Sequence, residues 1–304
     1  MSKLLFVLLL MLPTTIQAKR LALTFDDSPR HAKGLFDGPT RAKKFIENMK
    51  ANKVGPVVFF SNSKKLDDEG KARMMAYTKA GHIIANHTHT HPRFNDVSLK
   101  DYRADFIRGH AILSKLPNYK KWFRFPYLKE GDTPKKRDGM RRTLKAMGYQ
   151  NAYVTLNNSD WYFEDTFQKT LKQHPNLDLK KVGEFYVNNL IDNIEYYDKM
   201  AVKHLKRSPA HILLLHEMDI SALYIGDLVK ALRKNGWKII SLEEALKDEI
   251  AKYETKTIHK SNPGRIGEIA YDKGQKEGLW PVSMHYKTIK EGFAKVVKQS
   301  KKLR

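Results

Sequence analysis

Residues 20–29 of the chain read Arg-Leu-Ala-Leu-Thr-Phe-Asp-Asp-Ser-Pro. The first part of this stretch, Arg20–Phe25, has the composition of a buried strand, and it runs directly into two adjacent carboxylates, Asp26 and Asp27. Two acidic side chains at one strand end repel each other unless a positive group lies beside them. Taken alone, Asp-Asp before Ser-Pro is also typical of a turn or a helix cap. The stretch therefore predicts either a turn or the edge of a charged site.

Strand-like and helix-like segments alternate beyond this stretch. The predicted strands are Arg20–Phe25, Val54–Ser61, His82–Asn86, Trp122–Phe125, Ala152–Leu156, His211–Leu215 and Lys238–Leu242. The predicted helices are Thr40–Met49, Ser98–Leu116, Thr133–Met147, Val182–Leu205 and Ser221–Asn235. This alternation favours an α/β fold with a parallel sheet, either a barrel or a doubly wound sheet. Chemistry is then expected at the carboxyl ends of the strands.

Composition limits the chemistry that the chain can use. Its 304 residues include 56 Lys plus Arg and 33 Asp plus Glu, a net charge of +23, and 41% are hydrophobic. That hydrophobic fraction is too high for a disordered chain. The absence of cysteine excludes disulfides, thiolate metal sites and cysteine nucleophiles. Any metal must therefore be bound by His, Asp or Glu.

The first eighteen residues have the pattern of a secretory signal peptide. A positive start at Met1–Lys3 precedes the apolar run Leu4–Leu12, and Ala18 ends a plausible cleavage site before Lys19. The alternative is a buried N-terminal strand or helix. No later stretch has the ~18 consecutive apolar residues of a membrane span. We expect a secreted protein, periplasmic or extracellular, without a membrane anchor after cleavage and without a nucleic-acid partner.

The end of the chain differs from the rest. After Leu246 the alternation stops, and residues 251–304 hold 13 Lys plus Arg against five Asp plus Glu, a net charge of +8. A helix is predicted over Tyr286–Leu303. We therefore expect a catalytic domain over residues 19–250 and a basic C-terminal extension over residues 251–304.

Histidines follow the third predicted strand. If this stretch turns as a helix, His87 and His91 share a face at i and i+4 and could hold one divalent ion together with a carboxylate. The spacing alone is weak evidence in a chain with 12 histidines. Placement strengthens it, because the Asp pair and the His pair both lie at strand ends. Two His and one carboxylate leave coordination positions open, as in catalytic zinc sites, although other divalent metals also accept these ligands.

Five ordered motifs resemble those of the NodB-homology polysaccharide deacetylases, carbohydrate esterase family four. They are Thr24–Pro29, Gly81-His82 leading to His87-Thr88-x-x-His91-Pro92, Arg124-Phe125-Pro126-Tyr127, Asp160-Trp161, and Leu214-Leu215-His216. The resemblance covers residues 20–247. It implies a distorted (β/α) barrel of about seven strands and a metal-dependent deacetylase.

The resemblance also assigns the metal site and the general base. It implies that Asp27, His87 and His91 bind one divalent metal ion, with zinc favoured. Asp26 is expected to deprotonate the attacking water. Arg124 is expected to pair with Asp26 and to keep the pKa of its carboxyl low enough for ionisation.

The remaining motif residues are expected to act on the leaving group and the acetyl group. By similarity, His216 is the general acid, and Asp160 orients its ring and raises its pKa. Tyr127 would donate its backbone N–H to the oxyanion. Trp161 and Leu214 would form the wall of the acetyl pocket. Each motif also has a plain structural alternative, namely a buried strand with an incidental Arg or a satisfied His.

Some residues depart from the family pattern. Ser28 stands where glycine is usual, Asn157 where an acidic residue is frequent, and Glu217 where Asp is common. The long polar stretch Tyr162–Leu179 is predicted to be a rim loop that sets substrate preference.

Charge guides the choice of substrate. Residues 118–149 hold 10 Lys plus Arg against three Asp plus Glu, so an anionic wall polymer, peptidoglycan, is the favoured acetylated glycan. The basic residues could alternatively be solvated faces that only maintain solubility. Chitin or another poly-N-acetylglucosamine is the nearest alternative substrate, and acetylated xylan is a further one. A catalytically silent wall-binding module is the alternative from another class.

Overall fold

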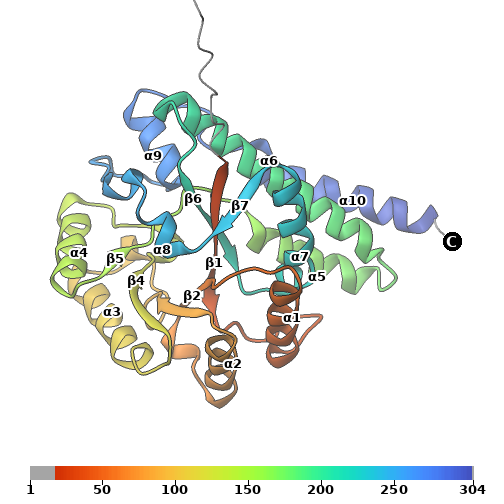
Figure 1. Cartoon of the computed structure of the whole chain (residues 1–304), viewed down its shortest axis with the longest axis horizontal. Coiled ribbons are helices and arrows are strands. Elements are labelled where there is room, and N and C mark those ends of the chain that lie inside the picture. The colour runs from red at the N-terminus through yellow and green to blue at the C-terminus, as the bar shows by residue number, and fades with distance from the viewer. Residues whose placement is uncertain (1–17, 303–304) are drawn as a thin grey trace, which may run out of the picture.

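A curled sheet of parallel strands forms the centre of the structure, a computed structural model that describes residues 18–302 (Figure 1). The strands of this sheet are β1 (Lys19–Ser28), β2 (Val58–Ser61), β3 (Ile83–Asn86), β4 (Tyr119–Phe123), β5 (Gln150–Asn151), β6 (Ala210–His216) and β7 (Trp237–Ile240). Their order is β5-β4-β3-β2-β1-β6, and β7 pairs with β1. The predicted signal peptide lies almost entirely outside the described residues.

Strand β1 is the longest and lies at the centre. Its first half pairs with β7, its second half pairs with β2, and β6 accompanies it from Arg20 to Asp26. Leu21, Leu23 and Phe25 on one face and Ala22 and Thr24 on the other are all buried, as expected for a strand of a parallel sheet that is covered on both faces. Since β1 and β6 are parallel and in register, Asp26 lies directly beside His216 at their carboxyl ends.

An irregular segment brings the two ends of the sheet together. The strand predicted at Ala152–Leu156 is wrong except for one bridge, between Leu156 and Leu213 of β6. The backbone N–H groups of Thr155 and Leu156 both donate to the carbonyl of Ile212, and the Val154 carbonyl accepts the N–H of Arg265. These bonds replace a regular ladder. The sheet is therefore a curled, incompletely closed barrel, which confirms the predicted fold class.

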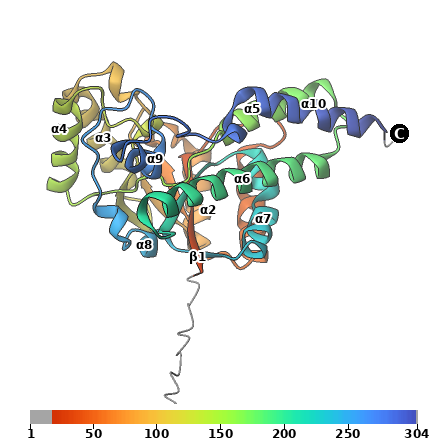
Figure 2. The ribbon, with the colours of Figure 1, turned by 90° about the horizontal axis from the view of Figure 1, so that it is seen from above.

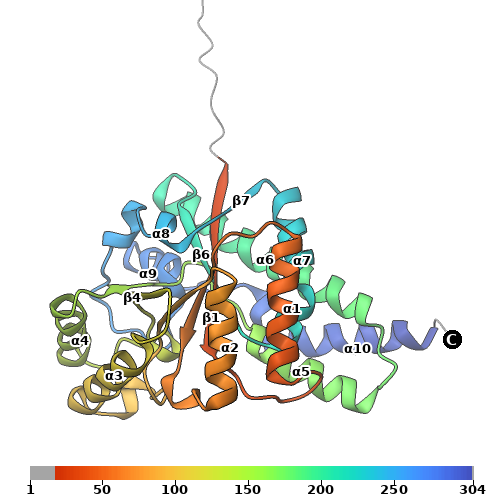
Figure 3. The same ribbon diagram turned by 60° about the horizontal axis from the view of Figure 1, so that its bottom comes forward.

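Helices cover the outside of the sheet (Figure 3). They are α1 (Gly38–Ala51), α2 (Asp68–Lys79), α3 (Leu99–Leu113), α4 (Pro134–Ala146), α5 (Asp160–Gln173), α6 (Leu179–Leu205), α7 (Asp219–Lys234), α8 (Leu242–Ala245), α9 (Gly264–Asp272) and α10 (Tyr286–Lys302). The five helices predicted before residue 250 are present. Within residues 18–302, no helix combines the length and apolar composition needed to cross a bilayer.

Helix α5 occupies most of the stretch predicted to be a rim loop, so that prediction is wrong. Phe163 and Phe167, four residues apart, are buried in the main core, and Leu171 packs against it. The Glu164 carboxylate accepts the backbone N–H of Ile220 at the start of α7. Apolar contacts on one face and a buried hydrogen bond thus stabilise a helix whose remaining residues are polar.

The basic C-terminal segment shares its core with the barrel. Helix α9 packs on α6, and α10 lies along α5 and α6 (Figure 2). Ile266, Leu279, Ile289 and Phe293 are buried in the main apolar cluster. The α10 lysines at positions 287, 290, 295, 298 and 301 are exposed. The segment is therefore a packed layer with a basic exposed side.

Candidate active site

The carboxyl ends of four strands bring the predicted residues together. Asp26 and Asp27 lie near the end of β1, the loop after β3 carries the histidines, and Arg124 follows β4. His216 is the last residue of β6. Because all the strands are parallel, these ends lie at the same edge of the barrel.

Asp27, His87 and His91 form the group of potential metal ligands. The Asp27 Oδ1 atom lies 3.0 Å from His91 Nε2 and 3.6 Å from His87 Nε2, and one ligand atom from each residue lies within 4.8 Å of the others. Asp27 Oδ1 is buried and has no hydrogen-bond partner among the described residues. An unpaired buried carboxylate oxygen between two imidazoles fits a bound cation.

Protonation of this group also suits metal binding. His87 donates its Nδ1 proton to the Arg124 carbonyl, 2.8 Å away, which leaves Nε2 free to act as a ligand. Burial lowers the pKa of His87 well below its usual range, so the ring is neutral. Burial raises the pKa of Asp27, but the close His91 ring and nearby positive charge outweigh this and leave that pKa well below its usual range. A neutral imidazole and an ionised carboxylate are the forms that bind metals.

A loop, not a helical turn, brings the two histidines together. Residues 87–91 are irregular, with left-handed backbone at Thr88 (φ 72°) and His91 (φ 61°). The Thr88 N–H donates to the Asn86 side chain, and the His91 N–H donates to the Thr88 hydroxyl. His89 points elsewhere and bonds Ser63 through Nδ1. It is therefore not part of the ligand group.

Asp26 forms a buried ion pair with Arg124. Arg124 Nη1 lies 2.7 Å from Asp26 Oδ1, and the guanidinium also donates to the Thr24 hydroxyl and the Ala152 carbonyl. Burial raises the pKa of Asp26 above its ordinary value, although Arg124 acts in the opposite direction. Desolvation of the carboxylate is thus the larger of the two effects on this pKa, and the expected pairing with Arg124 limits the rise.

Asp160 holds His216 from the first turn of α5. Asp160 Oδ1 lies 2.7 Å from His216 Nδ1, and Oδ2 accepts the His216 backbone N–H at 2.8 Å. Burial lowers the pKa of His216, but the Asp160 carboxylate outweighs this and raises it above the ordinary value. Asn158 fixes Asp160 by accepting its backbone N–H. The pair is therefore arranged as an acid and its orienting group.

The other three predicted residues lie on neighbouring parts of the same edge. Tyr127 has left-handed backbone (φ 57°), and its ring contacts that of His91 at 4.6 Å between centroids. Leu214 precedes His216 by two residues and faces the same side of β6. Trp161 follows Asp160 and is partly exposed. Their roles stay predictions.

Comparison with known proteins identifies the domain. Residues 14–152 match the family model described as polysaccharide deacetylase. This part of the chain, slightly less than half of its 304 residues, is therefore similar to polysaccharide deacetylases. The match includes the metal-ligand group, Asp26, Arg124 and Tyr127, whereas Asp160 and His216 lie beyond its end.

Individual relatives agree with this domain. The peptidoglycan-N-acetylglucosamine deacetylase of Bacillus cereus is 33% identical over 109 residues, which is 35% of this chain and 35% of that protein. The chain thus aligns with about a third of that relative. The peptidoglycan deacetylase PdaC from Bacillus subtilis has the same fold, with a TM-score of 0.50 at 20% identity over 76% of this chain and 92% of that structure.

A catalytically altered relative also shares the fold of this deacetylase domain. The carbohydrate esterase family four pseudoenzyme BA3943 from Bacillus anthracis aligns with a TM-score of 0.51 at 16% identity, over 76% of this chain and 66% of that structure. The barrel therefore does not by itself decide whether a protein is an enzyme. The side chains at the strand ends must carry that conclusion.

Sequence reasoning missed several charged residues around the site of this deacetylase domain. Arg30 Nη1 lies 3.1 Å from Asp27 Oδ2, and the Lys65 ammonium donates to the Asp27 carbonyl. Glu217 is fully buried and accepts hydrogen bonds from the Arg30 N–H, the Tyr77 hydroxyl and the Arg73 guanidinium. Glu217 was visible only as a departure from the family pattern. The Arg30 and Lys65 contacts had no signal in the sequence.

Proposed function

We propose that this protein is a secreted, metal-dependent N-deacetylase that removes acetyl groups from N-acetylhexosamine residues of peptidoglycan. One observation carries the proposal. A metal-ligand group (Asp27, His87 and His91) lies beside a carboxylate paired with Arg124, and a histidine held by a second carboxylate ends the adjacent strand. A metal site, a general base and a general acid together are sufficient for hydrolysis of an amide by an activated water.

Asp26 and His216 have opposite proton-transfer roles in this proposal. Asp26 accepts a proton from the water that attacks the acetyl carbonyl, and its raised pKa makes it a stronger base. Protonated His216 donates to the amine nitrogen as the C–N bond breaks, which releases acetate and a free amine. The Tyr127 backbone N–H donates to the oxyanion, and Trp161 and Leu214 enclose the acetyl methyl group.

A divalent ion bound by the metal-ligand group supplies Lewis acidity, which activates water and polarises a carbonyl. Zinc is the ion we propose, because two imidazoles and one carboxylate with open positions are typical of its catalytic sites. The hydrogen bond from His87 Nδ1 to the Arg124 carbonyl supports a metal site here, because it fixes the orientation of the ring and leaves Nε2 as the ligand atom.

Peptidoglycan is proposed as the substrate on two grounds. The named deacetylases that resemble this chain act on peptidoglycan according to their names. The net charge of +23 also favours an anionic polymer over neutral chitin or xylan. Secretion is proposed from the pattern of residues 1–18, which would deliver the enzyme to that polymer.

A catalytically silent wall-binding module is the second candidate, because a pseudoenzyme shares the fold. The intact ion pair of Asp26 with Arg124 and the intact pair of His216 with Asp160 argue against it. A module that only binds glycan would have no use for a buried, desolvated acid and base.

Mass spectrometry of three substrates tests the proposal. Purified wall fragments, chitin oligomers and acetylated xylan are each incubated with the protein, with and without a chelator. We expect loss of acetyl groups from a hexosamine of the wall fragments, abolition by chelator, and recovery when zinc is added back. Acetyl loss only from chitin or xylan would show that this polymer, and not peptidoglycan, is the substrate. Wall binding without acetyl loss, in zinc-loaded protein, would favour the silent module.

A further inference from the structure

An exposed group of aromatic rings lies beside Asp160. Trp161 and Tyr286 meet edge to face, with 5.5 Å between ring centroids, and Tyr162 stacks on Tyr286 at 4.1 Å. Trp161 and Tyr286 remain 39% and 49% exposed. Two of these rings belong to α5, whereas Tyr286 begins α10 in the C-terminal segment, 125 residues further along the chain.

Hydrogen bonds fix this part of the C-terminal segment to the start of α5. The Ser159 hydroxyl donates to the carbonyl of Met284 at 3.0 Å. Asn189 of α6 donates to the carbonyl of Ser283, and the Ser283 hydroxyl donates to Asn193. Tyr286 follows directly on this anchored stretch. Its position relative to α5 is therefore fixed on both sides, by ring stacking and by the backbone bonds.

The same helix start holds the predicted general acid. Asp160, the first residue of α5, lies between Ser159, which anchors the C-terminal segment, and Trp161, which contacts Tyr286. Asp160 in turn holds His216 at 2.7 Å. The exposed aromatic group and the acid are thus connected through consecutive residues of one element.

We propose that Tyr286, packed against Trp161, supplies a sugar-stacking surface that binds the glycan residue next to the one that is deacetylated. This proposal rests on the function proposed above and adds a subsite that the C-terminal segment supplies. A pyranose ring has an apolar face of C–H groups and a rim of hydroxyls. Tyrosine and tryptophan match it, because each offers an apolar ring face with a polar group at its edge.

Position and exposure favour a glycan over other occupants. Exposed aromatic rings that lie in contact with one another, as Trp161 and Tyr286 do, form an apolar surface that is suited to binding a ligand. A chain held at the acid must continue along the surface in one direction or another, and the aromatic group lies immediately beside the residue that holds the acid. Ring edges and hydroxyls at this surface suit a polar ligand with an apolar face.

Substrate length separates this subsite from the catalytic centre. A tetramer of N-acetylglucosamine can occupy both places, whereas the N-acetylglucosamine monosaccharide can occupy only the catalytic centre. Tyr286→Ala is expected to raise KM for the tetramer by roughly three- to tenfold, the size of one lost aromatic contact, with kcat unchanged. KM for the monosaccharide should change by less than about twofold in the same variant.

Two further variants control for the loss of ring stacking and for the segment itself. Tyr286→Phe keeps the ring and should keep KM for the tetramer close to that of the native protein. Val282→Ala alters an exposed side chain of the same segment, 67% accessible and not aromatic, and should have no effect. Circular dichroism and thermal melting of each variant establish that the fold is retained.

Calorimetric titration of the tetramer into Asp26→Asn protein, with and without Tyr286→Ala, gives a readout independent of turnover. We expect the same three- to tenfold loss of affinity.

An unchanged KM and affinity for the tetramer in Tyr286→Ala would overturn the subsite. So would Tyr286→Ala dissociating a dimer on gel filtration without any change in tetramer binding, because the aromatic group would then be a self-association surface. If the native protein deacetylates no glycan, the proposed function is rejected. If the native protein is active and Tyr286→Ala has the same KM and affinity for the tetramer, only the subsite is rejected.

Discussion

Asp160 holds His216 at two points, through Oδ1 to the ring Nδ1 at 2.7 Å and through Oδ2 to the backbone N–H at 2.8 Å. The first contact places a proton on Nδ1 and leaves Nε2 to exchange a proton with a ligand. The second ties the carboxylate to the strand that carries the histidine, so ring and carboxylate cannot rotate independently. This arrangement raises the pKa of His216 against the effect of its burial.

Asp160→Asn should move the alkaline limb of the pH profile to lower pH. A general acid works only while protonated, so a raised pKa of His216 extends activity upward in pH. The substitution removes the negative charge that stabilises the imidazolium, and the pKa of His216 then falls. We expect the limb of kcat/KM to shift downward, together with a loss of roughly 10²-fold or more at neutral pH.

Asp165→Asn provides the matched control for this charge. Asp165 lies on the same helix and is exposed, so its variant removes one negative charge without touching His216. Its pH profile should coincide with that of the native protein. If Asp160→Asn and Asp165→Asn gave the same alkaline limb, the assignment of His216 as the acid would have to be abandoned.

His87→Ala should abolish metal binding while the fold is retained. His87 is buried, neutral and oriented by the Arg124 carbonyl, so its Nε2 faces the Asp27 carboxylate and is free to bind a metal. Metal content, measured by plasma mass spectrometry after equilibration with zinc, should fall from about one ion per chain to near zero. His89→Ala is the control, since that ring bonds Ser63 outside the ligand group. Unchanged metal content in His87→Ala would reject this site.

Asp26→Asn should lose activity while keeping the metal. The substitution preserves the shape of the side chain and its contact with Arg124, but it removes the group that accepts a proton. We expect a decrease in kcat of about 10²- to 10⁴-fold, with metal content equal to that of the native protein. Near-normal turnover in this variant would show that another group is the base.

Much of the site could be predicted because parallel strands converge. Asp26 and His216 are 190 positions apart in the sequence, yet both end apolar runs, and the carboxyl ends of parallel strands share one edge. Their register contact follows from that rule. The metal-ligand group was found in the same way. The order of the five motifs then gave each residue a specific expected role.

Other features depend on opposing energetic effects and on long-range contacts that cannot be read from the sequence. The loop at residues 87–91 uses left-handed backbone at Thr88 and His91, neither of which is glycine. The pKa of Asp26 depends on how completely the fold removes water from it, and burial outweighs Arg124. The ion pair between Glu217 and Arg73 joins residues that are 144 positions apart in the sequence. Helix α5 is different. Its apolar residues have helical spacing in the sequence, but the polarity of the whole stretch favoured a loop.

Asp248→Asn should reduce stability at neutral pH but not in acid. Asp248 accepts hydrogen bonds from the Arg207 guanidinium and from the N–H groups of Ala210 and Ile250. These contacts overcome the effect of burial and lower its pKa to about 2. A depressed folded-state pKa gives stability that is complete above the unfolded pKa of about 3.9 and is lost as pH falls toward 2.

Thermal melting as a function of pH measures this effect. The variant should be less stable by roughly 1–3 kcal/mol at pH 7, and its melting temperature should converge on that of the native protein as pH falls from about 5 to about 2. A constant difference across this range would mean that the Asp248 charge is not what stabilises the contact.

The exposed face of α10 should bind the protein to anionic wall polymer. This face presents five exposed lysines with one exposed glutamate between them, namely Lys287, Lys290, Lys295, Lys298 and Lys301, and Glu291. Its opposite face packs into the core through Ile289 and Phe293. Deleting residues 251–304 would therefore expose the core, and charge substitution on the outer face is the better test.

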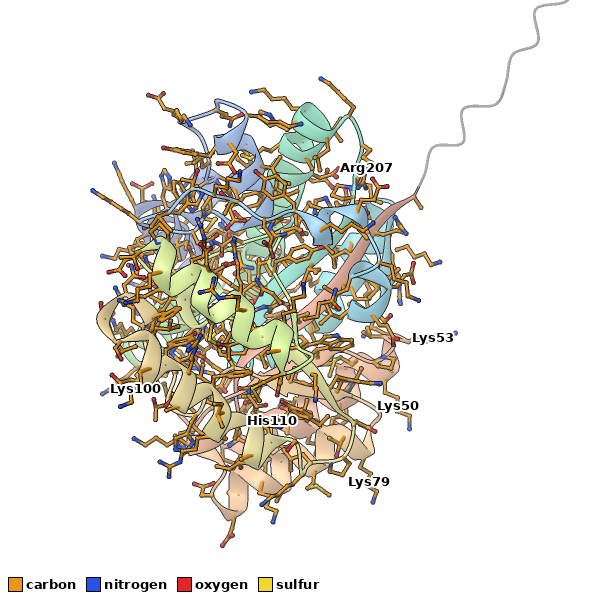
Figure 4. All side chains as sticks on the ribbon, turned by 90° about the vertical axis from the view of Figure 1, so that its left-hand side faces the viewer. Lys50, Lys53, Lys79, Lys100, His110 and Arg207 are labelled. Atoms are coloured by element: carbon orange, nitrogen blue, oxygen red, sulfur yellow. The ribbon has the colours of Figure 1, made fainter. Side chains whose placement is uncertain are left out.

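The test variant combines Lys290→Gln, Lys295→Gln and Lys298→Gln, and its control makes the same change at Lys50, Lys53 and Lys79. The control lysines extend outward from the surface at the ends of α1 and α2 (Figure 4), which are the ends furthest from the active-site edge in a βα unit. Both variants lose three positive charges, so they differ only in where the charge is removed.

Exposed charges act over about 10 Å at 0.1 M salt. Co-sedimentation with purified wall should be strong at low salt and weak at high salt for the native protein, markedly weaker for the α10 variant at low salt, and close to native for the control. Turnover of a short neutral oligomer should be unchanged in both, because neither set contacts the acid, the base or the metal-ligand group.

Equal weakening in the two variants would mean that total charge, and not the α10 face, governs wall binding. A parallel loss of oligomer turnover in the α10 variant would instead make this face part of the catalytic surface.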